Sequence, residues 1–201
     1  MVRNLPVGIW QWAYSLNSYS GYVDAGGVAP IWARTREGAL IYEFKYQVGV
    51  SASRRQEIID LLLVGLSEFI EENVIRVYNG IPFDKVISVP SNRAGHTSLP
   101  EALGRRLCQL HPQLSYIEEP LLKTRAAETM KEVPKERRPL SVKGLYQVNP
   151  SLSNLDSKGI LVIDDVFETG STLNSVCDAV ATRFAGLKIF VVTITDLGAG
   201  R

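Results

Sequence analysis

The chain has 201 residues, of which 45% are hydrophobic and 21% are charged, and its formal net charge is +1. This length and apolar content predict one folded domain with a single large core. The near-zero net charge gives no overall electrostatic reason to expect nucleic acid or an anionic membrane as a partner, although a local basic patch leaves nucleic acid open.

The amino-terminal stretch is not typical of a secretory signal, because Pro6 and Gln11 interrupt its short apolar patch. No segment approaches the roughly 20 consecutive apolar residues that cross a bilayer. The two cysteines, Cys108 and Cys177, lie in predicted helices without Cys-x-x-Cys spacing. They are typical of small core residues in a reducing compartment. We therefore expect a cytoplasmic protein without membrane contact.

Residues 1–35 are rich in aromatic and small residues, and we predict loops with two short strands there. Most of the aromatic rings are expected to cover the edge of the core. A flat ring also offers a stacking surface for a purine or pyrimidine. We therefore interpret residues 1–37 as an extension that forms a small hood beside a main domain over residues 38–201.

The next two segments predict a strand and a helix. Residues 36–38 are typical of a turn, and the apolar residues that follow predict a strand over Ala39–Phe44. Ser53 and Gln56 then form a capping-box pair. Apolar residues at i, i+3, i+4 and i+7 continue from there, so we predict a long amphipathic helix that ends near Glu72.

A second strand and helix follow. The apolar run Lys85–Val89 predicts a short buried strand, and Ser98 with Glu101 forms a capping box for a helix that ends at His111. The loop between these elements, residues 91–97, is polar and contains a cation. Ligands of open α/β sheets bind at the carboxyl ends of the strands, so this loop should lie at the ligand-binding edge.

The segment 123–143 is strongly basic. It carries seven basic residues and three acidic ones, and its apolar periodicity nearly vanishes. A charge run of this kind often indicates a solvated face, and part of it is compatible with a short exposed helix. It is equally compatible with a loop that covers a polyanion, so both interpretations stay open here.

The most informative stretch is Gly159–Leu173. Residues 160–163 are all apolar without alternation, which predicts a strand buried on both faces in a parallel sheet. Two carboxylates, Asp164 and Asp165, end this run. A helix follows, because apolar residues recur at helical spacing from Leu173 onward. A last strand is predicted over residues 187–195.

The turn between this strand and helix is suited to bind an anion. The first turn of a helix presents unpaired N–H groups and the positive end of the helix dipole. Gly170 allows close approach of a ligand, and the hydroxyls of Thr169, Ser171 and Thr172 add donors. The two carboxylates instead suit vicinal hydroxyls, as on a ribose, or a nearby Mg²⁺. Together these features describe a site for a ribose 5-phosphate.

Residues 160–172 resemble the binding signature for phosphoribosyl pyrophosphate (PRPP) in type I phosphoribosyltransferases. The signature has an apolar strand, two acids, two apolar residues and a Thr-Gly-x-Thr turn. The same strand is similar to a Walker B strand, but no G-x-x-x-x-G-K-[ST] motif occurs in the chain. One further alternative stays open, in which Asp165 and Ser171 only cap a helix.

The resemblance implies an α/β fold with an open, mostly parallel twisted sheet flanked by helices. It implies that Asp164 and Asp165 hold the ribose hydroxyls, with Mg²⁺ nearby, and that Thr169–Thr172 hold the 5-phosphate. The hypoxanthine-guanine branch has an acid next to this turn, near the purine, so Glu168 is a candidate acid or base toward the acceptor. A solvent-facing carboxylate is the alternative for Glu168.

Two other segments take roles from the same resemblance. The loop after the second strand matches the place where the family binds pyrophosphate, which assigns Ser91, Asn92 and Arg93 to that group. The basic segment matches a mobile lid that closes over PRPP and excludes water. The residues assigned to the lid are Lys123, Arg125 and Arg137.

The layout is similar to the ComF-like branch of the family. Residues 123–125 and 136–146 resemble its Arg-bearing helix and Val-x-Gly-aromatic strand, and the resemblance covers roughly residues 38–197. ComF-like proteins commonly begin with a Cys-x-x-Cys zinc module, which this sequence lacks. We therefore do not carry over a role in DNA uptake.

The resemblance implies transfer of a 5-phosphoribosyl group from PRPP to a nitrogen acceptor, a nucleobase or an amine, with Mg²⁺ and release of pyrophosphate. The sequence does not specify the acceptor. Two alternatives stay open: a non-catalytic PRPP-sensing or nucleic-acid-associated regulator, and a structural protein that only retains the fold. Dimers are common in this fold, so a homodimer also stays open.

Overall fold

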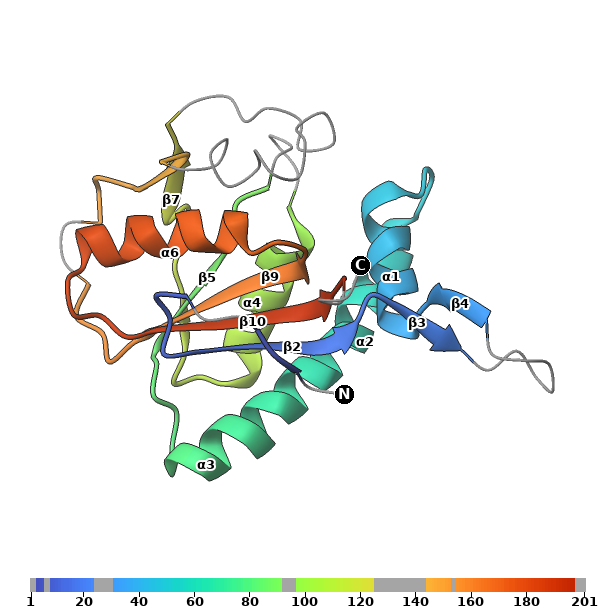
Figure 1. Ribbon diagram of the computed structural model, residues 1–201, viewed down its shortest axis with the longest axis horizontal. Helices are drawn as coiled ribbons and strands as arrows, with labels where there is room; N and C mark the ends of the chain where they lie inside the picture. The colour runs from blue at the N-terminus through green and yellow to red at the C-terminus, as the bar shows by residue number, and fades with distance from the viewer. Residues whose placement is uncertain are drawn as a thin grey trace.

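The computed structural model describes residues 3–5, 8–23, 31–91, 97–124, 144–152 and 155–197. These residues form an open, six-stranded sheet with the order β1-β2-β10-β9-β5-β6 (Figure 1). All neighbours pair in parallel except β1, which is antiparallel to β2. The predicted α/β fold is therefore confirmed. The strands are β1 (Arg3–Asn4), β2 (Trp12–Ser18), β5 (Lys85–Ser88), β6 (Ser115–Tyr116), β9 (Ile160–Phe167) and β10 (Ile189–Asp196).

Helices cover both faces of this sheet. The described helices are α1 (Arg36–Tyr46), α2 (Ala52–Phe69), η1 (Ile70–Ile75), α3 (Arg76–Tyr78), α4 (Leu99–Leu110) and α6 (Ser171–Arg183). Apolar residues of α1, α2 and α4 form one core cluster with the sheet, and those of α6 form a second cluster. Within the described residues, no helix is long and apolar enough to span a bilayer.

Strand β9 shows why its apolar run does not alternate. Leu161 and Ile163 belong to the cluster with α1, α2 and α4, whereas Ile160 and Val162 belong to the cluster with α6. All four side chains are at most 2% exposed. The predicted strand with two buried faces is therefore confirmed, and successive residues of β9 point to opposite sides of the sheet.

The prediction of loops and two short strands over residues 1–35 is wrong for β2. This seven-residue strand lies between β1 and β10 in the main sheet. Trp12 packs on the rings of Phe69, Phe83 and Phe190. The strand was hard to find because its other face is lined by small residues, including the fully buried Ser15, which a hydrophobic pattern does not detect.

Two short antiparallel ribbons complete the described fold. One pairs β3 (Ser20–Val23) with β4 (Ile31–Arg34), and it extends beyond the edge of the main sheet (Figure 1). The other pairs β7 (Leu121–Lys123) with β8 (Tyr146–Val148). Because β2 is part of the main sheet, only the β3–β4 ribbon of the described residues is still a candidate for the predicted hood. The division of the chain into a hood and a main domain at residue 37 stays a prediction.

The predicted turn over residues 36–38 and the strand over Ala39–Phe44 are wrong, because these residues form α1. The helix begins after Thr35, whose hydroxyl accepts the N–H of Gly38 at 3.1 Å. Leu40, Ile41 and Phe44 are buried at helical spacing. Gly38 does not mark a turn here: a Cβ at this position would lie 2.0 Å from the carbonyl oxygen of Tyr19. Glycine is required because two backbones pack closely.

The start of α2 also differs from the prediction. Its N-cap is Ser51, which accepts the N–H of Arg54 at 3.1 Å, and Ser53 lies inside the helix. The helix passes into η1 and α3 and so continues beyond Glu72. The capping box of Ser98 and Glu101 in α4 is confirmed, as are the strands predicted at residues 85–89 and 187–195.

Candidate functional site

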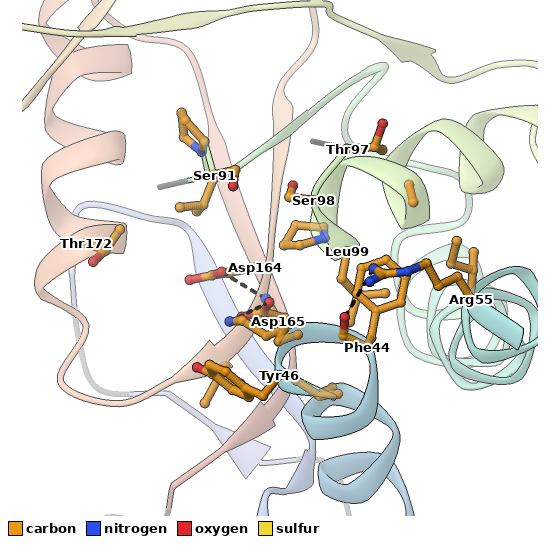
Figure 2. Close-up of a pocket in the computed structure, with 18 of the residues that line it drawn as sticks. Phe44, Tyr46, Arg55, Ser91, Thr97, Ser98, Leu99, Asp164, Asp165 and Thr172 are labelled. Carbon is orange, nitrogen blue, oxygen red and sulfur yellow. Dashed lines mark hydrogen bonds and ion pairs between the residues drawn. The ribbon is translucent and has the colours of Figure 1, made fainter. Parts of the chain in front are cut away.

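A cleft of about 1060 Å³ lies at the carboxyl ends of β5 and β9. Helices α1, α2, α4 and α6 all contribute to its lining (Figure 2). Five of the residues that the sequence singles out lie along it: Ser91, Asp164, Asp165, Glu168 and Thr172. The fold therefore brings together the polar residues that follow two neighbouring parallel strands, as expected for an open α/β sheet.

The two aspartates of the cleft have different surroundings. Asp164 extends toward the start of α6, and Asp165 lies beside the end of α1 (Figure 2). The Nζ atom of Lys45 is 3.0 Å from Oδ1 and 2.9 Å from Oδ2 of Asp165. Asp164 instead accepts the backbone N–H of Asp165 at 2.9 Å. Both carboxylates line the cleft, although they start from opposite faces of β9, because successive residues of a strand point to opposite faces.

The environment changes the protonation of this group. Burial and, to a smaller extent, the negative charge of Asp165 raise the pKa of Asp164 to about 8. The charge of Lys45 and the hydrogen bond from the Asp165 amide lower this pKa, but they do not outweigh burial. Burial alone would lower the pKa of Lys45, but the charge of Asp165 and its hydrogen bond outweigh burial and raise it. Lys45 therefore stays an ammonium, and hydroxyl donors or a cation beside Asp164 would favour its ionised form.

The turn after β9 has the conformation that its sequence predicts. Gly170 is the N-cap of α6 with φ of +74°, and a Cβ there would lie 2.9 Å from the ring of Phe167. Glycine is thus required both for the left-handed backbone and for space. The hydroxyls of Thr169 and Ser171 are 2.9 Å apart, and Thr172 lines the cleft.

The alternative in which Asp165 and Ser171 cap the helix is wrong. The N-cap residue of α6 is Gly170, and it makes no side-chain capping bond. Asp165 is paired with Lys45, and the hydroxyl of Ser171 bonds to that of Thr169. The first turn of α6 therefore has no carboxylate cap, which keeps its positive end suited to an external anion.

The residues predicted to bind pyrophosphate and to form the lid are described only in part. Ser91 lines the cleft, and its carbonyl oxygen accepts a hydrogen bond from Nζ of Lys123 at 2.9 Å. Lys123 is the last residue of β7, so it lies at the base of the predicted lid and not within a loop. Burial lowers the pKa of Lys123. The other assigned residues, Asn92, Arg93, Arg125 and Arg137, lie outside the described residues.

The cleft also contains residues that the sequence does not assign to a site, among them Lys45, Arg55 and Tyr146. Lys45 was missed because α1 was interpreted as a strand, although Leu40, Ile41 and Phe44 already show helical spacing. Arg55 donates to the carbonyl oxygen of Phe44 at 3.2 Å, and its guanidinium lies 5.0 Å from the centre of the Phe44 ring.

Tyr146 belongs to β8, which lies in the β7–β8 ribbon and not in the main sheet with β5 and β9. Burial raises its pKa to about 12, and the charge of Asp164 contributes. Its phenol is therefore neutral at physiological pH and can donate a hydrogen bond to a ligand oxygen. The sequence shows only an aromatic residue in a short strand, with no signal for a position in the cleft.

The donor set of the cleft suits a Mg²⁺ ion that arrives with its own oxygen ligands. Within the described ranges, no group of three His, Cys, Asp or Glu side chains is placed to hold a metal. Asp165 is engaged by Lys45, which leaves Asp164 as the carboxylate directed at the start of α6. Mg²⁺ commonly combines one or two carboxylates with phosphate oxygens, so Asp164 is the residue that could hold such an ion together with a phosphate-bearing ligand.

Comparison with models of known protein families gives no match, and no curated protein is significantly similar to the chain.

Proposed function

We propose that this protein is a PRPP-dependent phosphoribosyltransferase that uses Mg²⁺ and acts in the cytoplasm. One observation carries the proposal: Asp164 in the carboxyl-terminal half of β9 and Thr172 in the first turn of α6 line the same cleft. A carboxylate that can accept hydrogen bonds from hydroxyls and a turn suited to an anion thus share one ligand-sized space, which supports a ribose 5-phosphate as the ligand. The cleft is also large enough for a second small molecule beside the sugar.

In this proposal each part of the β9–α6 connection has one task. Asp164 accepts hydrogen bonds from the vicinal ribose hydroxyls. The amides and hydroxyls of residues 169–172 hold the 5-phosphate, and Gly170 lets the backbone approach it. The neutral phenol of Tyr146 donates to an oxygen of the ligand. Mg²⁺, when bound with PRPP, would neutralise charge on the diphosphate.

The reaction breaks the bond between C1 of the ribose and the diphosphate oxygen, and the diphosphate leaves with the electron pair. The lone pair of the acceptor nitrogen forms the new bond to C1, and the nitrogen then loses a proton. In this proposal Glu168, which is exposed and lines the cleft, accepts this proton. Holding the sugar and excluding water contribute most of the rate in such a reaction, because the transition state has cationic character at C1.

Calorimetry with PRPP and MgCl₂ tests binding, and an assay of pyrophosphate release with purines, pyrimidines, ammonia and small amines tests catalysis. We expect heat of binding in the wild type, a strong loss in Asp164→Asn, and pyrophosphate release with one acceptor class. No heat with PRPP would contradict the proposal. Heat without product from any acceptor would favour a PRPP-sensing protein instead.

A further inference from the structure

The ion pair between Lys45 and Asp165 joins two parts of the chain that are 120 residues apart. Lys45 is near the end of α1, and Asp165 is near the end of β9. The Lys45 ammonium contacts both carboxylate oxygens, at 3.0 and 2.9 Å. The side chain of Asp165 is 9% exposed and that of Lys45 is 35% exposed, so the pair is partly withdrawn from water at the floor of the cleft.

This pair is linked to Asp164 through the backbone. The N–H of Asp165 donates to Oδ1 of Asp164 at 2.9 Å. A change in the position of Asp165 therefore moves the group that orients Asp164. Two adjacent carboxylates in a partly buried site also repel each other, and a cation on one of them relieves that repulsion. Lys45 is well placed to supply this charge.

We propose that Lys45 is a positioning residue of the site: by holding both oxygens of Asp165, it leaves Asp164 as the carboxylate that receives the sugar hydroxyls. This inference rests on the proposed function and deepens it. Lys45 itself does not contact the ligand in this arrangement. Its effect reaches the ligand through the carboxylate of Asp165 and the amide that orients Asp164.

The experiment compares Lys45→Met, Lys45→Arg and the double variant Lys45→Met with Asp165→Asn. Affinities for PRPP, ribose 5-phosphate and inorganic pyrophosphate are measured by calorimetry with MgCl₂ at a temperature where every variant is folded. We expect Lys45→Met to weaken PRPP and ribose 5-phosphate by about tenfold or more, because it leaves a buried carboxylate unpaired. Pyrophosphate affinity should stay unchanged.

Lys45→Arg keeps the charge and should bind PRPP within about threefold of the wild type. The double variant removes both charges, so it should recover most of the affinity lost in Lys45→Met. This recovery is the decisive result, because a residue that contacts the ligand directly would not be rescued by a change at Asp165. If Lys45→Met alone fails to fold, the PRPP affinity of the double variant is compared with that of the wild type, and we expect the two to be similar.

Arg54→Met provides the matched control. Arg54 forms a two-bond ion pair with Glu43 at 2.7 and 2.8 Å, which also involves α1, but neither residue lines the cleft. Loss of this ion pair in Arg54→Met should lower the melting temperature of the protein and leave its affinity for PRPP unchanged.

Three results would overturn the positioning role while PRPP still binds the wild type. One is wild-type PRPP affinity in Lys45→Met. Another is an equal loss of pyrophosphate affinity, which would make Lys45 a direct phosphate ligand. The last is a double variant without recovery. Failure of the wild type to bind PRPP is a different outcome, because it removes the proposed function itself.

Discussion

The cleft has two walls that are built in different ways. The β9–α6 wall consists of consecutive residues, 164–172, whose shape follows from local backbone geometry around Gly170. The α1 wall consists of residues 44–46, and the ion pair of Lys45 and Asp165 joins it to the first wall. The first wall offers polar groups to a ligand, whereas the second engages one of those groups. Two neighbouring aspartates therefore acquire different roles from their packing.

The largest expected effect tests this difference directly. Asp164→Asn should weaken PRPP binding by about 100-fold, because each hydrogen bond to a charged group contributes about 1.5–3 kcal/mol. Asp165→Asn should weaken it much less. Calorimetry with MgCl₂ measures both, and near-ultraviolet circular dichroism checks that each variant keeps its packing. Equal losses of PRPP affinity in the two variants would show that Asp164 and Asp165 contribute equally to binding, and this would contradict the prediction.

The second prediction concerns the geometry of the β9–α6 wall. Gly170→Ala should lower the free energy of unfolding by about 2 kcal/mol, because the backbone is left-handed and the new Cβ meets the Phe167 ring. Gly186→Ala is the control, since φ there is +86° but no atom lies within 4 Å of an added Cβ. It should cost only about 1 kcal/mol. Urea unfolding measures both, and equal costs would contradict the contact with Phe167.

The third prediction uses the protonation of Asp164. The folded protein holds this proton up to a pKa of about 8, whereas the unfolded chain loses it near 3.8. The folded state binds more protons between these values, so the wild type loses stability as pH rises through this window. Asp164→Asn removes the effect, and relative to the wild type it should gain about 3–4 kcal/mol between pH 5 and pH 8.

Urea unfolding at several pH values measures this gain. Asp178→Asn, at an exposed position of α6, is the control and should follow the wild type at every pH. A constant difference between Asp164→Asn and the wild type across this range would contradict the raised pKa of Asp164.

The smallest expected effect concerns α2, which lies behind the α1 wall. Ser51→Ala should destabilise the protein by about 1 kcal/mol, because it removes the N-cap of α2. Ser53→Ala should change stability by less than about 0.5 kcal/mol, since Ser53 is an exposed residue inside the helix. Thermal unfolding compares the two variants. A larger loss of stability in Ser53→Ala than in Ser51→Ala would contradict this prediction and would support Ser53 as the cap, as the sequence pattern suggests.

Local sequence patterns were sufficient where an element depends on its own residues. The double-sided burial of β9, the glycine turn and the capping box of α4 were all predicted. The patterns failed at α1 and β2. In α1 a glycine was interpreted as a turn, whereas it allows contact with the backbone at Tyr19. In β2 a fully buried serine hides the second face of the strand.

The sequence by itself determined the strand, the acidic pair and the glycine turn, because these residues are consecutive and their geometry is set by short-range sterics and backbone hydrogen bonding. Only the tertiary structure decided that Lys45 forms an ion pair with Asp165, that Tyr146 lines the cleft, and that Asp164 extends toward the start of α6. Contacts between residues so far apart in the chain depend on how helices pack on the sheet, and side-chain periodicity does not encode that packing.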